Sequence, residues 1–255
     1  TVNDVLVAKK FCQKYGALLI EDAAHVVRPY KDIGQYGDFV FYSPHKVLAV
    51  PTGAVLIVAL PLRTKFLDSM EGAFELENNN WHLEWLVKRV AQKVMPVAFQ
   101  RYLNRSIADF TFDNVPAELN HDSNLSKIAA NWLVAQISSM DHVCKSRKNN
   151  SLSLRKWFAI EAPDQTIFFS EATEGPAPYR FVLQCNDLKE AEDLYDRIRA
   201  LGIPVESWPD LPLEVINNPR DYFVARKLRD SLVFLPVHEL LPYTDMVFSN
   251  SGYSF

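Results

Sequence analysis

The sequence is short of cysteine, has no strong excess of charge and contains no long apolar run, and each absence excludes a class of protein. Its three cysteines, Cys12, Cys144 and Cys185, are odd in number, far apart and outside any CxxC pattern. This usage predicts a reduced, cytoplasmic protein without a metal cluster. A net charge of -4 and a charged fraction of 23% argue against a disordered chain and against an electrostatic nucleic-acid binder. No uncharged apolar run is long enough to span a bilayer, and no segment has the pattern of a signal peptide.

The apolar side chains that are present suffice for a full core. At 255 residues, 48% of them hydrophobic, the chain can form one large domain or two smaller ones. It has no initiator methionine, and its first residues, TVNDVLVAKKFCQKYG, look like the inside of a domain. We therefore expect natural sequence to be missing upstream.

The first part of the chain has the pattern of a βαβ fold. Apolar residues at helical spacing predict a helix over 5–15, which Gly16 would end. The run at 17–21 predicts a strand that is apolar on both faces, as in a parallel sheet covered on both sides. Strands are also expected at 38–42 and 53–59, and the short turn between these two favours a hairpin or adjacent strands.

The middle of the chain is predicted to be helical, over 62–70, 80–104, 125–140 and 144–160. The segment 80–104 is amphipathic and basic, and Pro96 should kink or divide it. Such a helix can lie on a membrane surface, but packing against the protein's own core or against a partner subunit is the more common outcome.

A second alternation of strands and helices follows residue 160. Strands are expected at 179–185, 203–206 and 232–235, and helices at 188–201 and 219–229. The predicted fold class is α/β, with a mainly parallel sheet and helices followed by a small α+β domain. We place the two domains at 1–160 and 161–255.

An acid and a lysine follow two neighbouring predicted strands. Asp22 ends the first, and Lys46 comes shortly after the second in Ser43-Pro44-His45-Lys46. In an open α/β sheet, ligands lie outside the carboxyl ends of the strands. A lysine that does covalent chemistry must be unprotonated part of the time, which partial burial or a charged His45 promotes. Taken singly, Lys46 reads as a solvated loop lysine, and Asp22 could cap a helix, bind a metal or pair with a heterocycle nitrogen.

One cofactor needs both residues. Pyridoxal phosphate requires a lysine that forms a Schiff base and an acid that keeps its ring nitrogen protonated. The pair Asp22 and Lys46 therefore suggests a pyridoxal-phosphate site more strongly than either residue does.

The order of motifs around this pair resembles the DegT/StrS-type pyridoxal-phosphate-dependent sugar aminotransferases, which have the aspartate aminotransferase fold. The matching motifs are Glu21-Asp22-Ala23-Ala24-His25, Gly37-Asp38-Phe39, Ser43, Lys46 and Pro51-Thr52-Gly53-Ala54. The resemblance continues through 126–147, 201–206 and 232–238 and covers nearly all of the chain. The family's glycine-containing phosphate turn and first strands lie before this stretch, so the resemblance implies a chain without the N-terminal part.

The resemblance implies roles for four residues. Asp22 would bind the pyridinium nitrogen, Lys46 would form the Schiff base and move protons, and Ser43 would contact the phosphate. His25 stands where the family has a glutamine near the ring hydroxyl. Some relatives are dehydratases with histidine in place of the lysine, so Lys46 favours transamination over dehydration.

The resemblance also implies partners. The family moves an amino group from glutamate or glutamine to a keto group of a nucleotide-linked sugar and works as a homodimer. The alternative is a non-catalytic or truncated relative that acts as a binding or regulatory module. His82, His121, His142 and His238 lack the spacing of metal ligands, so no metal is expected. Trp208 lies in a rigid loop that faces either a sugar or the space between domains.

Overall fold

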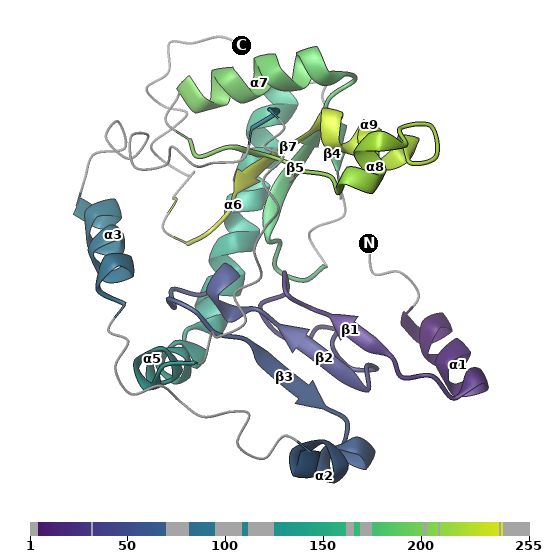
Figure 1. Ribbon diagram of the computed structural model, residues 1–255. Helices are drawn as coiled ribbons and strands as arrows, with labels where there is room; N and C mark the ends of the chain where they lie inside the picture. The colour runs from purple at the N-terminus through teal and green to yellow at the C-terminus, as the bar shows by residue number, and fades with distance from the viewer. Residues whose placement is uncertain are drawn as a thin grey trace. The chain divides into compact units, whose positions relative to one another are not determined.

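The computed structural model describes residues 5–31, 33–69, 82–94, 109–111, 125–161, 166–168, 175–200, 203–208, 210–239 and 241 (Figure 1). Contacts divide the chain into two compact units. Unit 1 consists of Thr1–Lys88, Asn120–Ser146 and Glu174–Tyr179, and unit 2 of Arg89–Leu119, Arg147–Thr173 and Arg180–Phe255. These limits differ from the domain boundary at residue 160, which stays a prediction.

Unit 1 contains a three-stranded sheet in the order β1-β2-β3 (Figure 1). Helix α1 (Val5–Tyr15) ends at Gly16, whose φ of 65° suits a residue without a side chain, and leads into β1 (Ile20–Asp22). β1 pairs in parallel with β2 (Phe39–Tyr42), which pairs in antiparallel fashion with β3 (Val55–Val58). The predicted parallel pair and the adjacent third strand are confirmed, although β1 and β3 are shorter than predicted.

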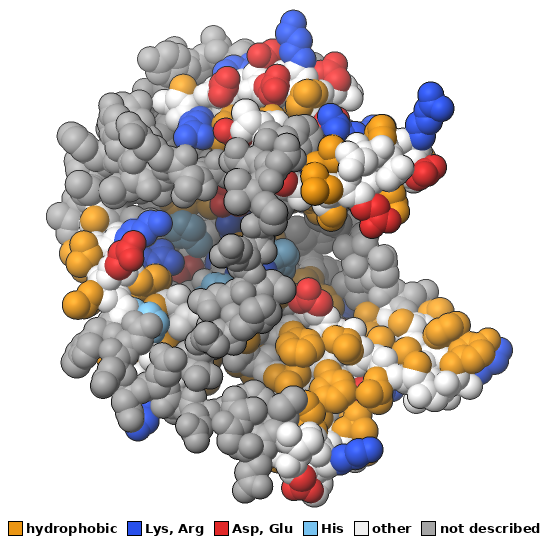
Figure 2. Space-filling model, in the orientation of Figure 1, with side chains coloured by type: hydrophobic (Ala, Val, Ile, Leu, Met, Phe, Trp, Pro, Cys, Tyr) orange, Lys and Arg blue, Asp and Glu red, His pale blue; other side chains and the backbone are white. Residues whose placement is uncertain are grey.

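The prediction that this sheet is covered on both faces is wrong for the described residues. Ala23, Val40 and Tyr42 are buried and form a small apolar cluster. The face that carries Ile20 and Phe41 is exposed, the Ile20 side chain to 64%. Figure 2 shows apolar side chains gathered over α1 and the sheet. α1 has no buried residue, so it does not cover this face.

The predicted middle helices are present. They are α2 (Leu60–Ser69), α3 (Leu83–Val94), α5 (Lys127–Ile137) and α6 (Met140–Glu161). Ser126 caps α5 by accepting a hydrogen bond from the Ala129 N–H at 3.1 Å. The predicted helix over 80–104 includes α3, whereas Pro96 and the second half of that prediction lie outside the described residues. No helix among the described residues is long and apolar enough to cross a membrane.

Unit 2 contains an antiparallel sheet in the order β4-β5-β7-β6, of which Figure 1 labels β4, β5 and β7. Its elements are β4 (Thr166–Phe168), β5 (Arg180–Gln184), α7 (Leu188–Ala200), β6 (Glu206–Ser207), α8 (Leu213–Asn217), α9 (Phe223–Ser231) and β7 (Leu232–Pro236). The sequence patterns miss β4 and α8. They predict β5, α7 and β7 to within about a residue at each end, and place β6 and α9 three to four residues too early at their starts.

The core of unit 2 is built from α6, α7 and the strands that they cover. Leu154, Leu183, Leu194 and Leu235 are fully buried in it. α7 begins with a reciprocal cap: Asp187 accepts from the Glu190 N–H at 2.9 Å, and Glu190 accepts from the Asn186 N–H at 2.7 Å. The mixed α/β fold class is confirmed.

Candidate active site

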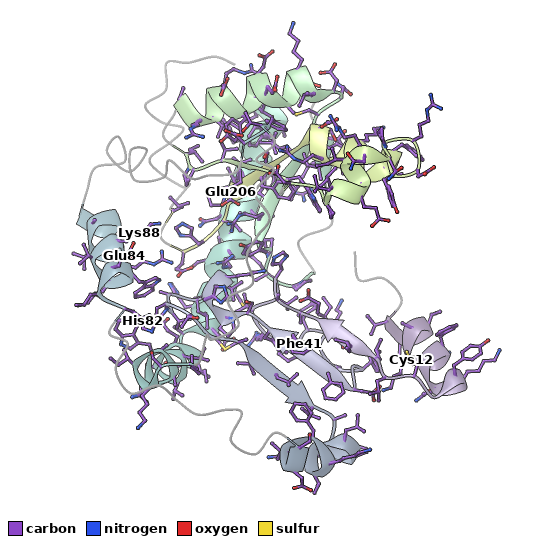
Figure 3. All side chains as sticks on the ribbon, viewed as in Figure 1. Cys12, Phe41, His82, Glu84, Lys88 and Glu206 are labelled. Carbon is purple, nitrogen blue, oxygen red and sulfur yellow. The ribbon has the colours of Figure 1, made fainter. Side chains whose placement is uncertain are left out.

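The parallel pairing of β1 and β2 sets the position of the predicted acid and lysine. Asp22 is the last residue of β1 and pairs in register with Phe41 of β2, which Figure 3 labels. Lys46 ends a single 3₁₀ turn, Pro44–Lys46, that begins after β2. Both side chains therefore follow the carboxyl ends of neighbouring parallel strands, the edge at which such sheets bind ligands.

The Glu21 carboxylate shapes the loop between β1 and β2. Glu21 is 8% exposed and accepts hydrogen bonds from the backbone N–H groups of Gly34, Tyr36 and Gly37, the last two at 3.4 and 3.0 Å. A Cβ atom on Gly34 would overlap the Tyr42 hydroxyl, and one on Gly37 would lie 2.7 Å from a backbone oxygen. The sequence shows the glycines as loop breakers but does not show that a buried carboxylate organises them.

Lys46 is exposed, as the interpretation of a solvated loop lysine implies, but its neighbours in the chain are buried. Val47, Leu48 and Val50 belong to an apolar cluster that also contains Val27 and Ala177. The Val47 and Leu48 N–H groups donate to the Pro44 carbonyl at 2.9 and 2.7 Å. The backbone of the turn that carries the lysine is therefore fixed by these hydrogen bonds and by the buried residues that follow it.

The imidazole that contacts Lys46 is that of His25. The His25 Nε2 atom lies 3.3 Å from Lys46 Nζ. The His25 ring is stacked on the Tyr179 ring, with centroids 4.3 Å apart and planes inclined by 6°. The His45 Nδ1 atom instead lies 3.1 Å from the Gly53 carbonyl oxygen and 3.4 Å from Ser43 Oγ. The sequence suggests His45 as the cationic neighbour of Lys46. It gives no signal for Tyr179, which lies 133 residues further along the chain than Lys46.

Two further acids near these strands have structural roles. Asp22 accepts from the Ala24 N–H at 2.9 Å and so tightens the first turn of the loop. Asp38 accepts from the Leu19 N–H at 2.8 Å and from Lys9 Nζ at 2.7 Å, which ties α1 to both strands. The Leu19 hydrogen bond, and then Lys9, hold the pKa of Asp38 below its ordinary value. Burial, and then the Glu21 charge, raise the pKa of Tyr42.

Among the described residues, the remaining titratable groups with shifted pKa values lie in unit 2. Burial lowers the pKa of His238 to about 4, and the charges of Arg147, Arg89 and Arg180 add to this effect. Burial raises the pKa of the Cys185 thiol to about 12, which suits a buried apolar side chain. Among the described residues, His, Cys, Asp and Glu side chains form no group of three that would hold a metal ion. His82, labelled in Figure 3, lies 2.8 Å from Ser126 Oγ.

Trp208 and the buried Arg229 also belong to unit 2. The Trp208 ring contacts Phe234, with centroids 5.5 Å apart, and is 37% exposed. Arg229 donates through Nη2 to Asp210 at 3.2 Å and to the Asp109 carbonyl at 2.9 Å. These contacts connect the Trp208 loop to other residues of unit 2. That the indole faces a sugar stays a prediction.

The fold is that of the corresponding part of sugar aminotransferases of known structure. An apo form of the putative sugar aminotransferase Spr1654 from Streptococcus pneumoniae superimposes with a TM-score of 0.60 at 16% sequence identity. The match covers 91% of this chain and 55% of that one. PseC of Helicobacter pylori, an aminotransferase involved in the biosynthesis of pseudoaminic acid, has a TM-score of 0.59 at 13% identity. That match covers 92% of this chain and 58% of PseC.

A third similar structure is that of another protein, DesI. DesI in the presence of its TDP-sugar product has a TM-score of 0.59 at 14% identity, over 93% of this chain and 55% of DesI. The chain thus spans less than two thirds of the length of these three structures. No protein-family model matches the sequence, and no curated protein matches it. At these identities the likeness establishes the fold, and the expected aminotransferase fold is confirmed.

Proposed function

We propose that this chain provides the lysine-bearing part of a pyridoxal-phosphate-dependent aminotransferase. The observation that carries the proposal is the placement of Asp22 and Lys46 after two parallel neighbouring strands, with His25 beside the lysine amine. The likeness to aminotransferase structures supports it. The side chains present also fit the cofactor. The Lys46 amine can combine with its carbonyl and the Asp22 carboxylate can pair with its ring nitrogen. The His25 imidazole and the Ser43 hydroxyl can form hydrogen bonds with its ring hydroxyl and phosphate.

Each of these side chains would have one task. Bound pyridoxal phosphate supplies a carbonyl that combines with amines and a ring that accepts electrons when a bond to hydrogen breaks. Lys46 would attach the cofactor through Nζ and afterwards carry protons. The Asp22 carboxylate would keep the ring nitrogen protonated, and the Ser43 hydroxyl would donate to the phosphate. His25, next to the lysine, would orient the reacting groups.

The attachment of the cofactor can be tested directly on the chain. We expect incubation with pyridoxal phosphate, followed by borohydride reduction and peptide mapping by mass spectrometry, to label Lys46 in preference to the exposed Lys127 on α5. Lys46→Ala should abolish the preferred label, whereas Lys127→Ala should leave it in place. Equal labelling of the two lysines in the folded protein would contradict the proposal and favour the non-catalytic binding or regulatory module.

The proposal also specifies the substrates. The amino donor would be glutamate or glutamine and the acceptor a keto group of a nucleotide-linked sugar. The DesI structure, in the presence of its TDP-sugar product, supports the choice of a nucleotide-linked sugar. The working form would be a homodimer in the cytoplasm. Formation of 2-oxoglutarate from glutamate that depends on a nucleotide-linked keto sugar would support this assignment. Loss of water from the sugar without its amination would instead indicate dehydration chemistry.

A further inference from the structure

The contacts of Lys46 point to a pair of residues that would prepare its amine for reaction. We propose that His25 takes up a proton from Lys46 and that Tyr179 is a positioning residue that holds the His25 ring in place. This inference deepens the proposed function and rests on it, because it concerns the same lysine. Tyr179 has no role in the sequence-based assignment of the site.

The geometry of the three side chains supports this assignment. His25 Nε2 lies 3.3 Å from Lys46 Nζ. This is just longer than the roughly 2.6–3.2 Å of a direct proton transfer, as is common for catalytic contacts before a substrate binds. The rings of His25 and Tyr179 are nearly parallel, at 6°, with centroids 4.3 Å apart. A parallel stack opposes rotation of the imidazole out of its plane, so it keeps Nε2 directed at the amine. The electron-rich face of the phenol also favours the positive charge that the imidazole gains with the proton.

One apolar cluster anchors all three side chains. Val27 lies two residues after His25, Val47 follows Lys46 directly, and Ala177 lies two residues before Tyr179. These three anchors are buried together in unit 1, at 7%, 3% and 7% exposure. Tyr179 itself packs against the same cluster. The exposed lysine and histidine therefore lie on backbone that is packed against one buried apolar cluster.

The proposed step moves one proton and no other atom. The bond between Lys46 Nζ and hydrogen breaks, a bond between that hydrogen and His25 Nε2 forms, and the electron pair stays on Nζ. The amine can then attack a carbonyl carbon, while the imidazole becomes an imidazolium. Histidine suits this task because its ring exchanges protons near neutral pH.

Limited reductive methylation measures the reactivity of Lys46 without any cofactor. The folded chain is treated briefly with formaldehyde and dimethylamine-borane, and mass spectrometry gives the labelling of Lys46 relative to Lys127 in the same molecule. We expect Tyr179→Leu to lower this ratio about two- to tenfold, the range that corresponds to the loss of one stacked ring pair. Tyr179→Phe keeps the ring and should keep the ratio. His25→Gln, which can form a hydrogen bond but is a poor proton acceptor, should lower the ratio at least as much.

A spectroscopic signature separates positioning from a general loss of structure. The His25 ring protons should resonate upfield in the wild-type protein and in Tyr179→Phe, because an aromatic ring lies over them, and should move downfield in Tyr179→Leu. A wild-type ratio in folded Tyr179→Leu would overturn the role of Tyr179. A wild-type ratio in His25→Gln would overturn the proton transfer. If methylation depends on both residues but pyridoxal phosphate does not label Lys46, the proposed function fails and this inference stands.

Discussion

The buried carboxylate of Glu21 is the residue on which the loop between β1 and β2 depends. Its oxygens accept three backbone N–H groups at a position that is 8% exposed. Replacing Glu21 by glutamine keeps the shape but turns an amide group toward those donors. We expect Glu21→Gln to lower the free energy of unfolding by about 1–3 kcal/mol in denaturant titrations. The exposed Glu192→Gln on α7 is the matched control and should change it by less than about 0.5 kcal/mol. Equal effects would mean that Glu21 does not hold the loop.

The depressed pKa of His238 makes the stability of the protein depend on pH. Its folded value of about 4 lies below the ordinary 6.5, so the unfolded state binds the proton more tightly. The stabilisation is complete above pH 6.5 and is lost as the pH falls to 4, by about 3 kcal/mol. The depressed pKa of Asp38 changes the stability only at lower pH, because the ordinary pKa of this carboxyl group is 3.8.

Two histidine substitutions test this dependence. His238→Gln should flatten the loss of unfolding free energy between pH 6.5 and 4, measured by urea denaturation at several pH values. His142→Gln changes an exposed histidine on α6 and should leave the slope as in the wild-type protein. A slope that survives in His238→Gln would assign the effect to other groups.

At the scale of the elements, the close approach of the β1–β2 loop to β2 makes glycine necessary at position 34. Gly34 has a φ of 75°, and a Cβ atom there would overlap the Tyr42 hydroxyl. Gly16 has a φ of 65° with nothing within 4 Å of such an atom, so it is a control for the backbone cost alone. We expect Gly16→Ala to cost about 1 kcal/mol and Gly34→Ala about 1–3 kcal/mol more.

A second substitution tests whether the overlap causes the difference. The Tyr42 hydroxyl is buried without a hydrogen-bond partner in the described part of the chain. Tyr42→Phe alone should therefore be nearly neutral in thermal unfolding, and it should recover part of the loss in Gly34→Ala. No recovery would show that the backbone strain at Gly34, and not the hydroxyl, sets the cost.

The elements also show what the sequence can and cannot predict. The sequence predicts α1, the parallel strands and α7 from the local spacing of their apolar residues. Gly16 marks the end of α1, and Asp187 marks the start of α7. Strand β4 has three residues and α8 five, which is too short for a periodic pattern. The strand-end position of Asp22 and Lys46 was predictable because it depends on neighbouring strands. The stack of His25 on Tyr179 was not, because it joins residues that are far apart in the sequence.

On the scale of the whole molecule, each unit has an apolar core of its own. Leu48 is 5% exposed in a cluster of unit 1, and Leu183 is fully buried in the core of unit 2. We expect each leucine to alanine change to cost about 2–5 kcal/mol, but within its own unit. Hydrogen exchange should speed up in β2 and β3 for Leu48→Ala and in β5 and β7 for Leu183→Ala. Equal acceleration of all four strands in both variants would mean that the chain unfolds as one cooperative body.

The cover of the unit 1 sheet was less predictable than the positions of its strands. The apolar pattern at 17–21 predicts a strand that is covered on both faces. In the described residues Leu18 is 58% and Ile20 64% exposed. An apolar sequence pattern predicts which surface of a strand is buried, but it does not identify the segment that covers this surface.

The way in which Glu21 holds its loop has a consequence for how this site can change during evolution. The carboxylate contacts backbone N–H groups, which every residue except proline possesses. The shape of the loop therefore requires Glu21, Gly34 and Gly37 but makes no demand on the side chain of the exposed Gln35. A library randomised at that position should retain folded members with many different residues. The loop beside the candidate site can thus acquire new side chains, and with them new ligand preferences, without a loss of its framework.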